Sequence, residues 1–521
     1  MKRLLFLLAT SVFCLATAAQ LRNPILPGFH PDPSVCRVDG DFYLVNSSFQ
    51  YFPGVPIYHS TDLEHWQQIG NVLSRPSQLQ LKGATSWQGI YAPTIRYHAG
   101  TYYMITTNVG HNGRTGRNAN SENFMVTAKN PAGPWSDPIW LQQGGIDPSL
   151  YFEGNKCYMV SNPDNTITLC EIDAKTGRQL TKSRPIWQGT GGRYPEGPHI
   201  YKKDGYYYLL ISEGGTELAH SLTMARSKNI YGPYTPNPQN PIFTHCSRKA
   251  QYSQIQGTGH GDLVQKQDGS WWLVMLAYRN FNGSYHHLGR ETYLAPVEWK
   301  AGEWPVVNGG NPIDTAATAQ KRRLHYDFTK PLGPEWLHIQ EPDTEAYELK
   351  DGRLRLFGSI LSMKENKQPT FVGLRQESAN ICVDTKVTLL DGEDGDQAGL
   401  CVYQINDGFA QMNLQNRRGS HYVRLCLQLK DHLFTMAEQS VPATAQVWMR
   451  LKSDGEKYYF SYSTDGKSYE QLGAIECLLL STEVAGGFTG VIVGMHSHMA
   501  SSKFQTGRSF ADFDFFDYQE N

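Results

Sequence analysis

Five segments of this chain repeat one pattern, and that repeat constrains the fold more than any other feature. Each segment has a short start, an apolar strand, a turn that contains glycine and an aromatic second strand. The leading residue and the aromatic residue eleven places later form the pairs Asp32 and Tyr43, Ala92 and Tyr103, Asp147 and Tyr158, Glu196 and Tyr207, and His260 and Trp271. The leading residues are roughly 50–65 residues apart, which is the length of a four-stranded propeller blade with its loops. The repeat predicts a five-bladed β-propeller, because an array of β-sandwiches would not need one period repeated five times.

The repeat ends near residue 300, and a second β domain follows it. Residues 311–325 are mostly small or polar and predict a linker. Beyond the linker, runs such as Arg353–Phe357 and Val447–Leu451 alternate apolar and polar residues, which is typical of half-buried strands. The sequence therefore predicts an all-β protein, with the propeller at residues 20–310 and a β-sandwich of jelly-roll kind at residues 326–521.

The first residues have the form of a secretory signal peptide. Lys2 and Arg3 precede an apolar stretch at residues 4–15, and small residues follow it before Gln20. That stretch is too short to span a bilayer, and no later segment is long and apolar enough to do so. We therefore expect residues 1–19 to be removed and the protein to be exported, to the periplasm or the medium.

Charge and cysteine usage exclude some classes of partner. The formal net charge of −2 leaves no basic surplus for nucleic acid, and a neutral polymer is the substrate class that needs charge least. Aromatic residues make up 12% of the chain, which suits sugar stacking and a large β core equally well. The cysteines show no metal-binding spacing. Cys157 and Cys170 flank a turn, so a disulfide across a hairpin and two buried thiols are both open.

Three of the five leading residues are acidic: Asp32, Asp147 and Glu196. The first strand of each propeller blade lines the central channel, so these side chains and His260 are expected to converge at one end of it. The turn glycine follows the leading residue at a variable distance, so a register slip of one residue is open, and it would turn a side chain to the other face. Crowded carboxylates raise at least one pKa without structural gain. Glycoside hydrolysis needs that difference, because it uses one protonated and one ionised carboxyl group.

Six motifs follow one another in order along the chain: Asn23–Ser34, Tyr91–Thr94, Gly145–Ser149, Glu196–His199, Gly257–Gly261 and Leu288–Thr292. Together they resemble glycoside hydrolase family 43, which holds β-xylosidases, α-L-arabinofuranosidases and arabinanases. The resemblance is close from residue 23 to about 305. The C-terminal half resembles the concanavalin-like sandwich of the two-domain members.

The resemblance assigns roles to five residues. Asp32 matches the general base, which activates water in a single inverting displacement. Glu196 matches the general acid, and Asp147 matches a third carboxylate that orients the acid and modulates its strength. His260 matches an axial histidine that lies beside a calcium ion or water in some members. Arg290 matches an arginine that reaches the sugar in the −1 pocket.

Other residues have weaker signals. Tyr91 stands where many members of the family carry Trp, which implies a different pocket wall. The loop residues Trp87, Phe49 and Tyr51 suit either sugar stacking or core packing. No cofactor is expected for catalysis. A structural calcium ion shared by Asp327 and Asp514 is one expectation, with plain solvation as its alternative; another is that the loop at 501–507 closes over the pocket.

The sequence-based hypothesis is an exo-acting enzyme that removes terminal α-L-arabinofuranosyl units from plant polysaccharides or their oligosaccharides. β-D-Xylosidase activity is the first alternative, because the two sugars present similarly placed hydroxyl groups. A retaining fructan hydrolase is another, but the chain reads His30-Pro31-Asp32 and Glu196-Gly197 where that class has Asn-Asp-Pro and Glu-Cys. A carbohydrate-binding protein without catalysis is the third alternative, and the presence of all three acids argues against it.

Overall fold

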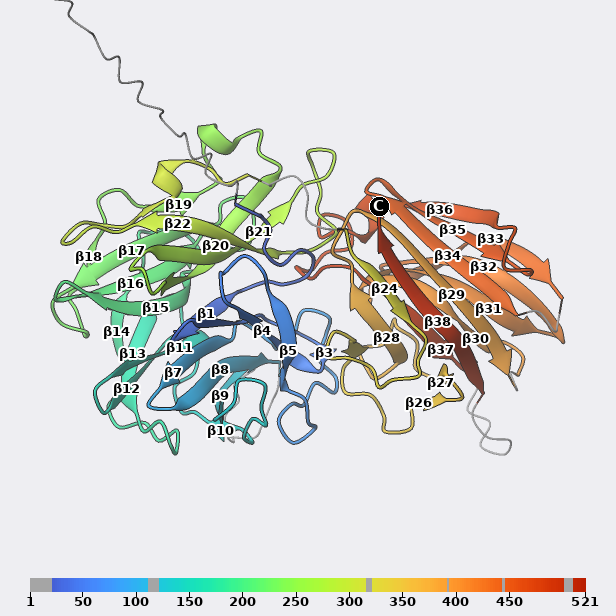
Figure 1. Cartoon of the computed structure of the whole chain (residues 1–521), viewed down its shortest axis with the longest axis horizontal. Coiled ribbons are helices and arrows are strands. Elements are labelled where there is room, and N and C mark those ends of the chain that lie inside the picture. The colour runs from blue at the N-terminus through green and yellow to red at the C-terminus, as the bar shows by residue number, and fades with distance from the viewer. Residues whose placement is uncertain (1–20, 111–120, 315–320, 391–392, 443–445, 501–508) are drawn as a thin grey trace, which may run out of the picture.

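The computed structural model describes residues 21–110, 121–314, 321–390, 393–442, 446–500 and 509–521. The described chain is built of strands, joined by turns and three short 3₁₀ segments, η1 (Arg248–Ala250), η2 (Asn308–Gly310) and η3 (Cys477–Leu480). Figure 1 shows two bodies side by side, a ring of small sheets formed by the first 300 residues and a stack of longer strands formed by the rest. No described helix is long and apolar enough to cross a membrane. The all-β prediction and its two-domain division are confirmed.

Five separate antiparallel sheets form the blades of the propeller. The first blade consists of β1 (Ser34–Val38), β2 (Asp41–Val45), β4 (Gly54–Ser60) and β5 (Gln67–Leu73). The second consists of β7 (Thr94–His98), β8 (Thr101–Val109), β9 (Ser121–Ala128) and β10 (Ile139–Trp140), with β6 (Gly89–Ile90) also paired to β8. The third consists of β11 (Ile146–Glu153), β12 (Lys156–Asn162), β13 (Ile167–Ile172) and β14 (Arg184–Trp187).

The last two blades follow the same plan. The fourth consists of β15 (Glu196–Lys203), β16 (Tyr206–Glu213), β17 (Ser221–Ser227), β18 (Thr235–Pro236) and β19 (Phe243–Thr244). The fifth consists of β20 (Ile255–Gln265), β21 (Trp271–Arg279), β22 (Glu291–Glu298) and β23 (Val306–Val307).

The inner strands of the blades contact one another around a closed ring. β1 contacts β7, β7 contacts β11, β11 contacts β15, β15 contacts β20, and β20 returns to β1. The N-terminal segment strengthens this closure, because Leu26 bridges to Thr292 on the fifth blade. Five blades therefore surround one axis, as the repeat predicted.

The register of the strands corrects one part of that prediction. Ser34 pairs with Val45 and Ser149 with Val160, so Asp32 and Asp147 each stand two residues before the first regular pair of their hairpin. In the fourth blade the corresponding pair is His199 with Leu210, and the residue two places earlier is Gly197. The predicted equivalence of Glu196 with the two aspartates is wrong by one residue. The cause lies in two adjacent tyrosines, which both pair with the inner strand. Tyr208, and not Tyr207, has the register position that Tyr43 and Tyr158 have in their blades.

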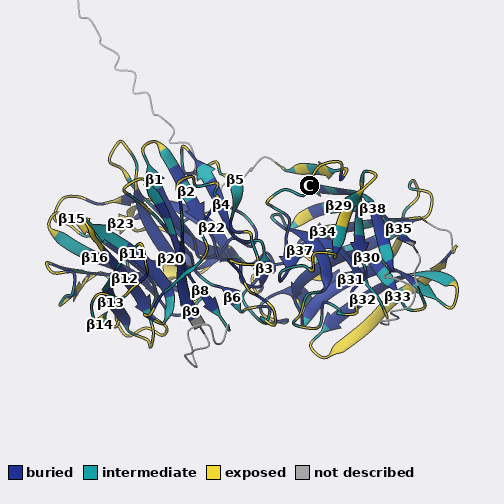
Figure 2. Ribbon diagram, turned by 90° about the horizontal axis from the view of Figure 1, so that it is seen from below, coloured by how far each residue is buried: buried dark blue, intermediate teal, exposed yellow. Residues whose placement is uncertain are grey.

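Two packed sheets form the C-terminal sandwich. The larger contains β24 (Arg323–Tyr326), β26 (Tyr347–Lys350), β27 (Arg353–Phe357), β29 (Asn380–Leu390), β34 (Val447–Asp454), β35 (Lys457–Ser463), β36 (Glu470–Glu476) and β38 (Phe510–Glu520). The smaller contains β28 (Thr370–Arg375), β30 (Gln397–Ile405), β31 (Gly408–Arg417), β32 (Ser420–Leu429), β33 (His432–Val441) and β37 (Ile492–His498). Alternation places Val447, Met449 and Leu451 in the core between the sheets. Figure 2 shows that core as buried and the edge strand β33 as exposed.

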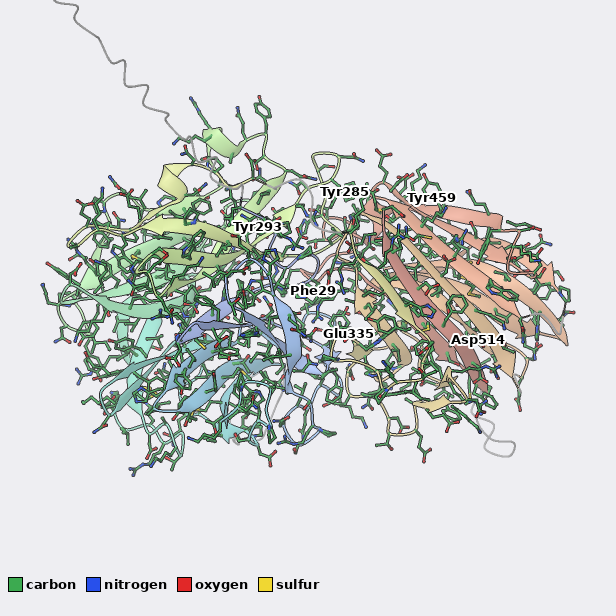
Figure 3. The ribbon with its side chains drawn as sticks, in the orientation of Figure 1. Phe29, Tyr285, Tyr293, Glu335, Tyr459 and Asp514 are labelled. Atoms are coloured by element: carbon green, nitrogen blue, oxygen red, sulfur yellow. The ribbon has the colours of Figure 1, made fainter. Side chains whose placement is uncertain are left out.

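The two domains share a sheet and a core at their junction. β3 (Tyr51–Phe52) in the propeller pairs with β25 (His338–Ile339) from the C-terminal half. Phe29, Phe49 and Tyr51 pack with apolar side chains of the sandwich in one buried cluster, and Figure 3 places Phe29 at this junction. Because apolar side chains of both domains are buried together, the sandwich is a structural part of the propeller face that it covers.

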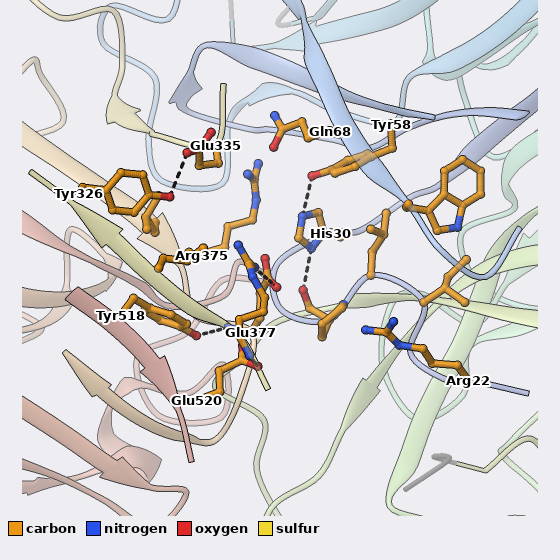
Figure 4. A pocket seen from close by; sticks show the side chains of 17 residues that line it. Arg22, His30, Tyr58, Gln68, Tyr326, Glu335, Arg375, Glu377, Tyr518 and Glu520 are labelled. Atoms are coloured by element: carbon orange, nitrogen blue, oxygen red, sulfur yellow. Dashed lines mark hydrogen bonds and ion pairs between the residues drawn. The ribbon is translucent and has the colours of Figure 1, made fainter. Parts of the chain in front are cut away.

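A charged cavity of about 350 Å³ also lies at the junction (Figure 4). Arg375 extends into it beside Glu335, and Arg322 forms an ion pair with Glu377. His30 lines the same cavity and hydrogen-bonds through Nε2 to the hydroxyl of Tyr58 at 2.8 Å. None of the three predicted catalytic acids lines this cavity.

The linker and the cysteines differ in detail from their predictions. β24 begins at Arg323, inside the predicted linker, and Ile313 is buried against the propeller, where its N–H donates to His245. Cys157 and Cys170 are buried free thiols on neighbouring strands, so the thiol alternative holds for this pair.

Candidate active site

A cavity of about 650 Å³ contains the leading residues of all five blades: Asp32, Ala92, Asp147, Glu196 and His260. These residues come from distant parts of the sequence, and the closed ring of inner strands brings them together. The predicted convergence of the three acids with the axial histidine is confirmed.

The backbone at this point is unusual in four of the five blades, the exception being the second blade at Ala92. Asp32, Asp147 and His260 have φ values of 53°, 54° and 42°, in the left-handed region that few non-glycine residues adopt. Gly197 takes the same place in the fourth blade, with φ of 56°. A Cβ atom there would lie 3.2 Å from the ring of His260, so the blade carries its acid one residue earlier, at Glu196. Strained backbone of this kind is typical of functional sites.

Asp32 is a buried carboxylate held by positive and hydroxyl partners. Arg290 Nη1 donates to its Oδ1 at 2.8 Å, and the hydroxyl of Ser47 donates to its Oδ2 at 2.5 Å. His260 Nδ1 lies 3.9 Å from the same Oδ1. Burial raises the pKa of Asp32, but Arg290, His260 and Ser47 together outweigh burial and hold the pKa below its usual value. Asp32 is therefore ionised at neutral pH.

Asp147 is equally buried, but it forms no ion pair with an arginine of the described segments. Its Oδ2 accepts a hydrogen bond from the N–H of Gly197 at 3.0 Å, and His260 Nδ1 lies 4.0 Å away. Burial raises the pKa of Asp147 to about 7, and although His260 opposes this, the charges of Glu196 and Asp32 add to it. Asp147 thus holds the backbone of the residue that follows Glu196.

Glu196 lines the cavity and contacts a histidine that the sequence analysis did not single out. His220 Nε2 lies 3.0 Å from Glu196 Oε1, and His220 Nδ1 lies 3.2 Å from the carbonyl oxygen of Gly257. The His220 side chain is fully buried. It precedes β17, in the outer half of the blade, where the repeat gave no reason to expect a site residue.

Aromatic rings from both domains form one wall of the cavity. Phe49 and Tyr91 line it from the propeller, and Phe488 lines it from a loop of the sandwich. The ring of Phe488 lies 5.3 Å from that of Phe49, and its carbonyl oxygen accepts a hydrogen bond from Arg290 Nε. Phe49 is both core and wall, whereas Tyr51 is wholly core. Trp87 does not line the cavity, so its predicted stacking role has no support.

Sequence reasoning missed Phe488 because nothing in a sandwich loop marks contact with a distant propeller. The alternative guess, the loop at 501–507, lies outside the described residues. Ser47 carried no signal either, since a lone serine after a strand is ordinary. The motif Gly257–Gly261 was the available pointer to His220, because the two lie in contact.

The predicted calcium ligands have other partners. Asp514 forms ion pairs with Lys386 at 2.6 Å and Arg353 at 3.1 Å, and Asp327 accepts hydrogen bonds from Thr329. His260 offers a ring nitrogen to Asp32 and Asp147, at 3.9 and 4.0 Å from their carboxylate oxygens, whereas calcium requires six to eight oxygen ligands. No group of three or more metal-ligating side chains occurs among the described residues. These residues do not fit calcium, and the chemistry below uses none.

Comparison with known proteins agrees with this geometry. Residues 21–305 match Glycosyl hydrolases family 43, and residues 325–519 match the Beta xylosidase C-terminal Concanavalin A-like domain. A non-reducing end alpha-L-arabinofuranosidase of Bacteroides ovatus is 41% identical, over 96% of this chain and 94% of the relative. A xylosidase/arabinosidase of Butyrivibrio fibrisolvens is 37% identical, over 96% of this chain and 99% of the relative.

Solved structures show the same architecture over the whole length. The structure of a family 43 protein from a xyloglucan locus of Bacteroides ovatus superimposes with a TM-score of 0.89 at 39% identity, covering 96% of this chain and 100% of the other. A xylan beta-1,4-xylosidase of Bacillus halodurans superimposes with a TM-score of 0.88 at 34% identity, with the same coverage. Both domains are thus matched along their length, and the chain belongs to glycosyl hydrolase family 43 as a two-domain glycosidase.

Proposed function

We propose that this protein is an exo-acting, inverting glycosidase that releases terminal α-L-arabinofuranosyl units from plant hemicelluloses or their oligosaccharides. The observation that carries this proposal is the pairing of two unlike acids in one cavity. Asp32 is kept ionised by Arg290, whereas Glu196 shares a hydrogen bond with the buried ring of His220. Hydrolysis of a glycosidic bond by inversion needs this combination of base and acid.

In the proposed displacement, Asp32 is the general base and Glu196 the general acid. A water oxygen attacks the anomeric carbon as Asp32 takes a proton from that water. The bond from the anomeric carbon to the glycosidic oxygen breaks, and that oxygen takes the proton of Glu196. The products are a sugar of inverted configuration and a free hydroxyl on the remaining glycan. The proton on Asp32 balances the one lost by Glu196 and returns through solvent.

The walls of the cavity support exo action. Phe488 from the sandwich closes the side that Phe49 and Tyr91 form in the propeller. Arg290 Nη2 is buried and has no hydrogen-bond partner among the described residues, which leaves a donor free for a sugar hydroxyl. Half-exposed Tyr194 stands at the rim, where a leaving-group sugar would lie. These residues support an arrangement in which one terminal sugar lies in the pocket and the rest of the glycan lies outside it.

The arabinofuranoside specificity rests on resemblance. The relative at 41% identity bears the name of a non-reducing end alpha-L-arabinofuranosidase, and the matching structure comes from a xyloglucan locus, so arabinose on xyloglucan or arabinoxylan is the substrate that we propose. β-D-Xylosidase activity is the second candidate, because other relatives at 30–37% identity are named as xylosidases.

A panel of 4-nitrophenyl glycosides tests the proposal. We expect kcat/KM to be highest for the α-L-arabinofuranoside and lower for the β-D-xyloside, with no turnover of a β-fructofuranoside analogue. A faster xyloside would select the second candidate, and no turnover of either pentoside would refute the glycosidase assignment. On arabinoxylan, free pentose should appear while viscosity hardly falls; a rapid fall in viscosity would mean endo action.

We also propose that residues 1–19 direct export. These residues lie outside the described part of the chain, and the proposal rests on the basic start and the short apolar stretch of the sequence. Mass spectrometry of the protein from periplasm or medium should find a mature N-terminus just after Ala18 or Ala19. Full-length protein confined to the cytoplasm would refute the proposal.

A further inference from the structure

Glu196 has a second partner besides Asp147, and the chemistry of that contact goes beyond the roles given above. His220 is fully buried and makes two hydrogen-bond contacts, one through each ring nitrogen. Nδ1 lies 3.2 Å from the carbonyl oxygen of Gly257, and a carbonyl oxygen only accepts. Nδ1 therefore carries a hydrogen atom, and in a neutral ring Nε2 has a lone pair.

A matched histidine in the same domain supports this tautomer. His245 Nδ1 lies 2.8 Å from the carbonyl oxygen of Ile255, and its Nε2 accepts a hydrogen bond from the N–H of Ile313 at 3.1 Å. His220 has the same environment on the Nδ1 side, but a carboxyl oxygen takes the place of the N–H donor. The 3.0 Å contact between His220 Nε2 and Glu196 Oε1 is a hydrogen bond only when the pair holds a proton.

The glycine-rich motif before His260 is shaped around this ring. Gly257 supplies the carbonyl oxygen that fixes Nδ1. A Cβ atom on Gly259 would lie 2.3 Å from Cε1 of His220, so only glycine lets the strand pass this close. The motif that places the axial histidine therefore also fixes the orientation of a second histidine.

We infer that His220 is the positioning residue of the general acid: its Nε2 accepts the proton-bearing oxygen of Glu196 and holds the protonated carboxyl group in place for the glycosidic oxygen. The inference rests on the proposed role of Glu196. It adds no reactant to the displacement, because the proton delivered is still that of Glu196.

Two substitutions of His220 separate positioning from structure. His220→Gln places an amide near Nε2 and keeps an acceptor for Glu196, whereas His220→Asn keeps a donor near Nδ1 for Gly257 and loses the contact with Glu196. We expect His220→Asn to lower kcat for an unactivated arabino-oligosaccharide by about 100-fold, and that for an aryl glycoside with a good leaving group by less than about 5-fold. His220→Gln should recover most of the lost rate.

The pH profile supplies a second readout. An acceptor for the protonated carboxyl group favours its protonated form, so His220→Asn should move the alkaline limb of kcat/KM to lower pH. The other titratable and charged groups around this pair are unchanged in the variant: Asp32, Asp147, His260, Arg290, Tyr91 and the rim pair of Arg193 and Glu217. His245→Asn is the matched control. It should change neither the alkaline limb of kcat/KM nor the dependence of kcat on the leaving group.

Gly259→Ala should reproduce the selective loss of His220→Asn, because its Cβ atom displaces the ring. Glu196→Gln is the reference in the same assays. Suppose that Glu196→Gln loses activity selectively on the unactivated substrate. If His220→Asn then loses activity equally on both substrates and leaves the alkaline limb of kcat/KM unmoved, the inference alone is overturned. No selectivity in Glu196→Gln would overturn the acid assignment, and the inference with it.

Discussion

Asp32 and Asp147 occupy equivalent places on two sides of the same cavity, and the pKa values of their carboxyl groups are shifted in opposite directions. Both precede the regular part of an inner strand, both have φ near 54°, and both are buried. Both also lie about 4 Å from the same nitrogen of His260. The charged neighbour of Asp32 is Arg290, whereas that of Asp147 is Glu196. The comparison teaches that the fold supplies position, while the neighbouring charges, Arg290 first among them for Asp32, set the direction of each pKa shift.

The largest effect is expected from Asp32→Asn. The variant has no base for the attacking water, so activity should fall by about 10³-fold or more on activated and unactivated substrates alike. Steady-state kinetics on the two substrate types measures this, with circular dichroism as the check on folding. A loss confined to unactivated substrates would exchange the roles of Asp32 and Glu196.

Glu196→Gln is expected to act selectively. A glutamine cannot protonate the departing oxygen, so kcat for an arabino-oligosaccharide should fall by about 10²–10⁴-fold. An activated aryl glycoside needs little protonation and should lose much less. The ratio of the two losses is the quantity to measure, and equal losses would contradict the assignment of the acid.

Arg290→Met should reduce the difference in pKa between Asp32 and Asp147. Without the guanidinium group, burial is no longer outweighed, the pKa of Asp32 rises, and the acidic limb of kcat/KM should move up by about one pH unit or more. Arg193→Met is a suitable control, because Arg193 lies at the exposed rim and pairs with Glu217. An unmoved limb in Arg290→Met would show that Arg290 does not set the charge state of Asp32.

Asp147→Asn should stabilise the protein, in a pH-dependent way. Folding raises the pKa of Asp147 from 3.8 to about 7, so the folded state keeps a proton that the unfolded state has already released. The resulting loss in the free energy of unfolding of the wild-type protein is absent below pH 4, grows between pH 4 and pH 7, and is complete above pH 7. The variant should gain on the order of 2–4 kcal/mol at pH 8 and little at pH 4. Equal effects at both pH values in denaturant titrations would refute the raised pKa.

The sequence was most informative where the fold repeats itself. Asp32, Asp147 and His260 could be found because each blade begins with the same pattern, and a closed ring brings such positions together. Glu196 was found as an acid but was placed one residue out, because Tyr207 and Tyr208 serve the pattern equally well. Only the pairing of strands decides between such registers.

Contacts between distant segments could not be predicted in the same way. Phe488 reaches the cavity because the sandwich docks through β25 and a shared core, and no local pattern records docking. His220 precedes β17, outside the repeated hairpin, and its role depends on how closely Gly259 passes its ring. Trp87 shows the converse, since an exposed aromatic residue beside a site need not belong to it.

Proton NMR of the first sugar released tests the central claim most directly. If Asp32 activates water while Glu196 protonates the leaving oxygen, hydrolysis of an α-L-arabinofuranoside must first yield β-L-arabinofuranose, with the α anomer appearing only as the sugar mutarotates. Early release of α-L-arabinofuranose would require a covalent intermediate on one of the carboxylates. That result would contradict the assignment of Asp32 as the base that activates water.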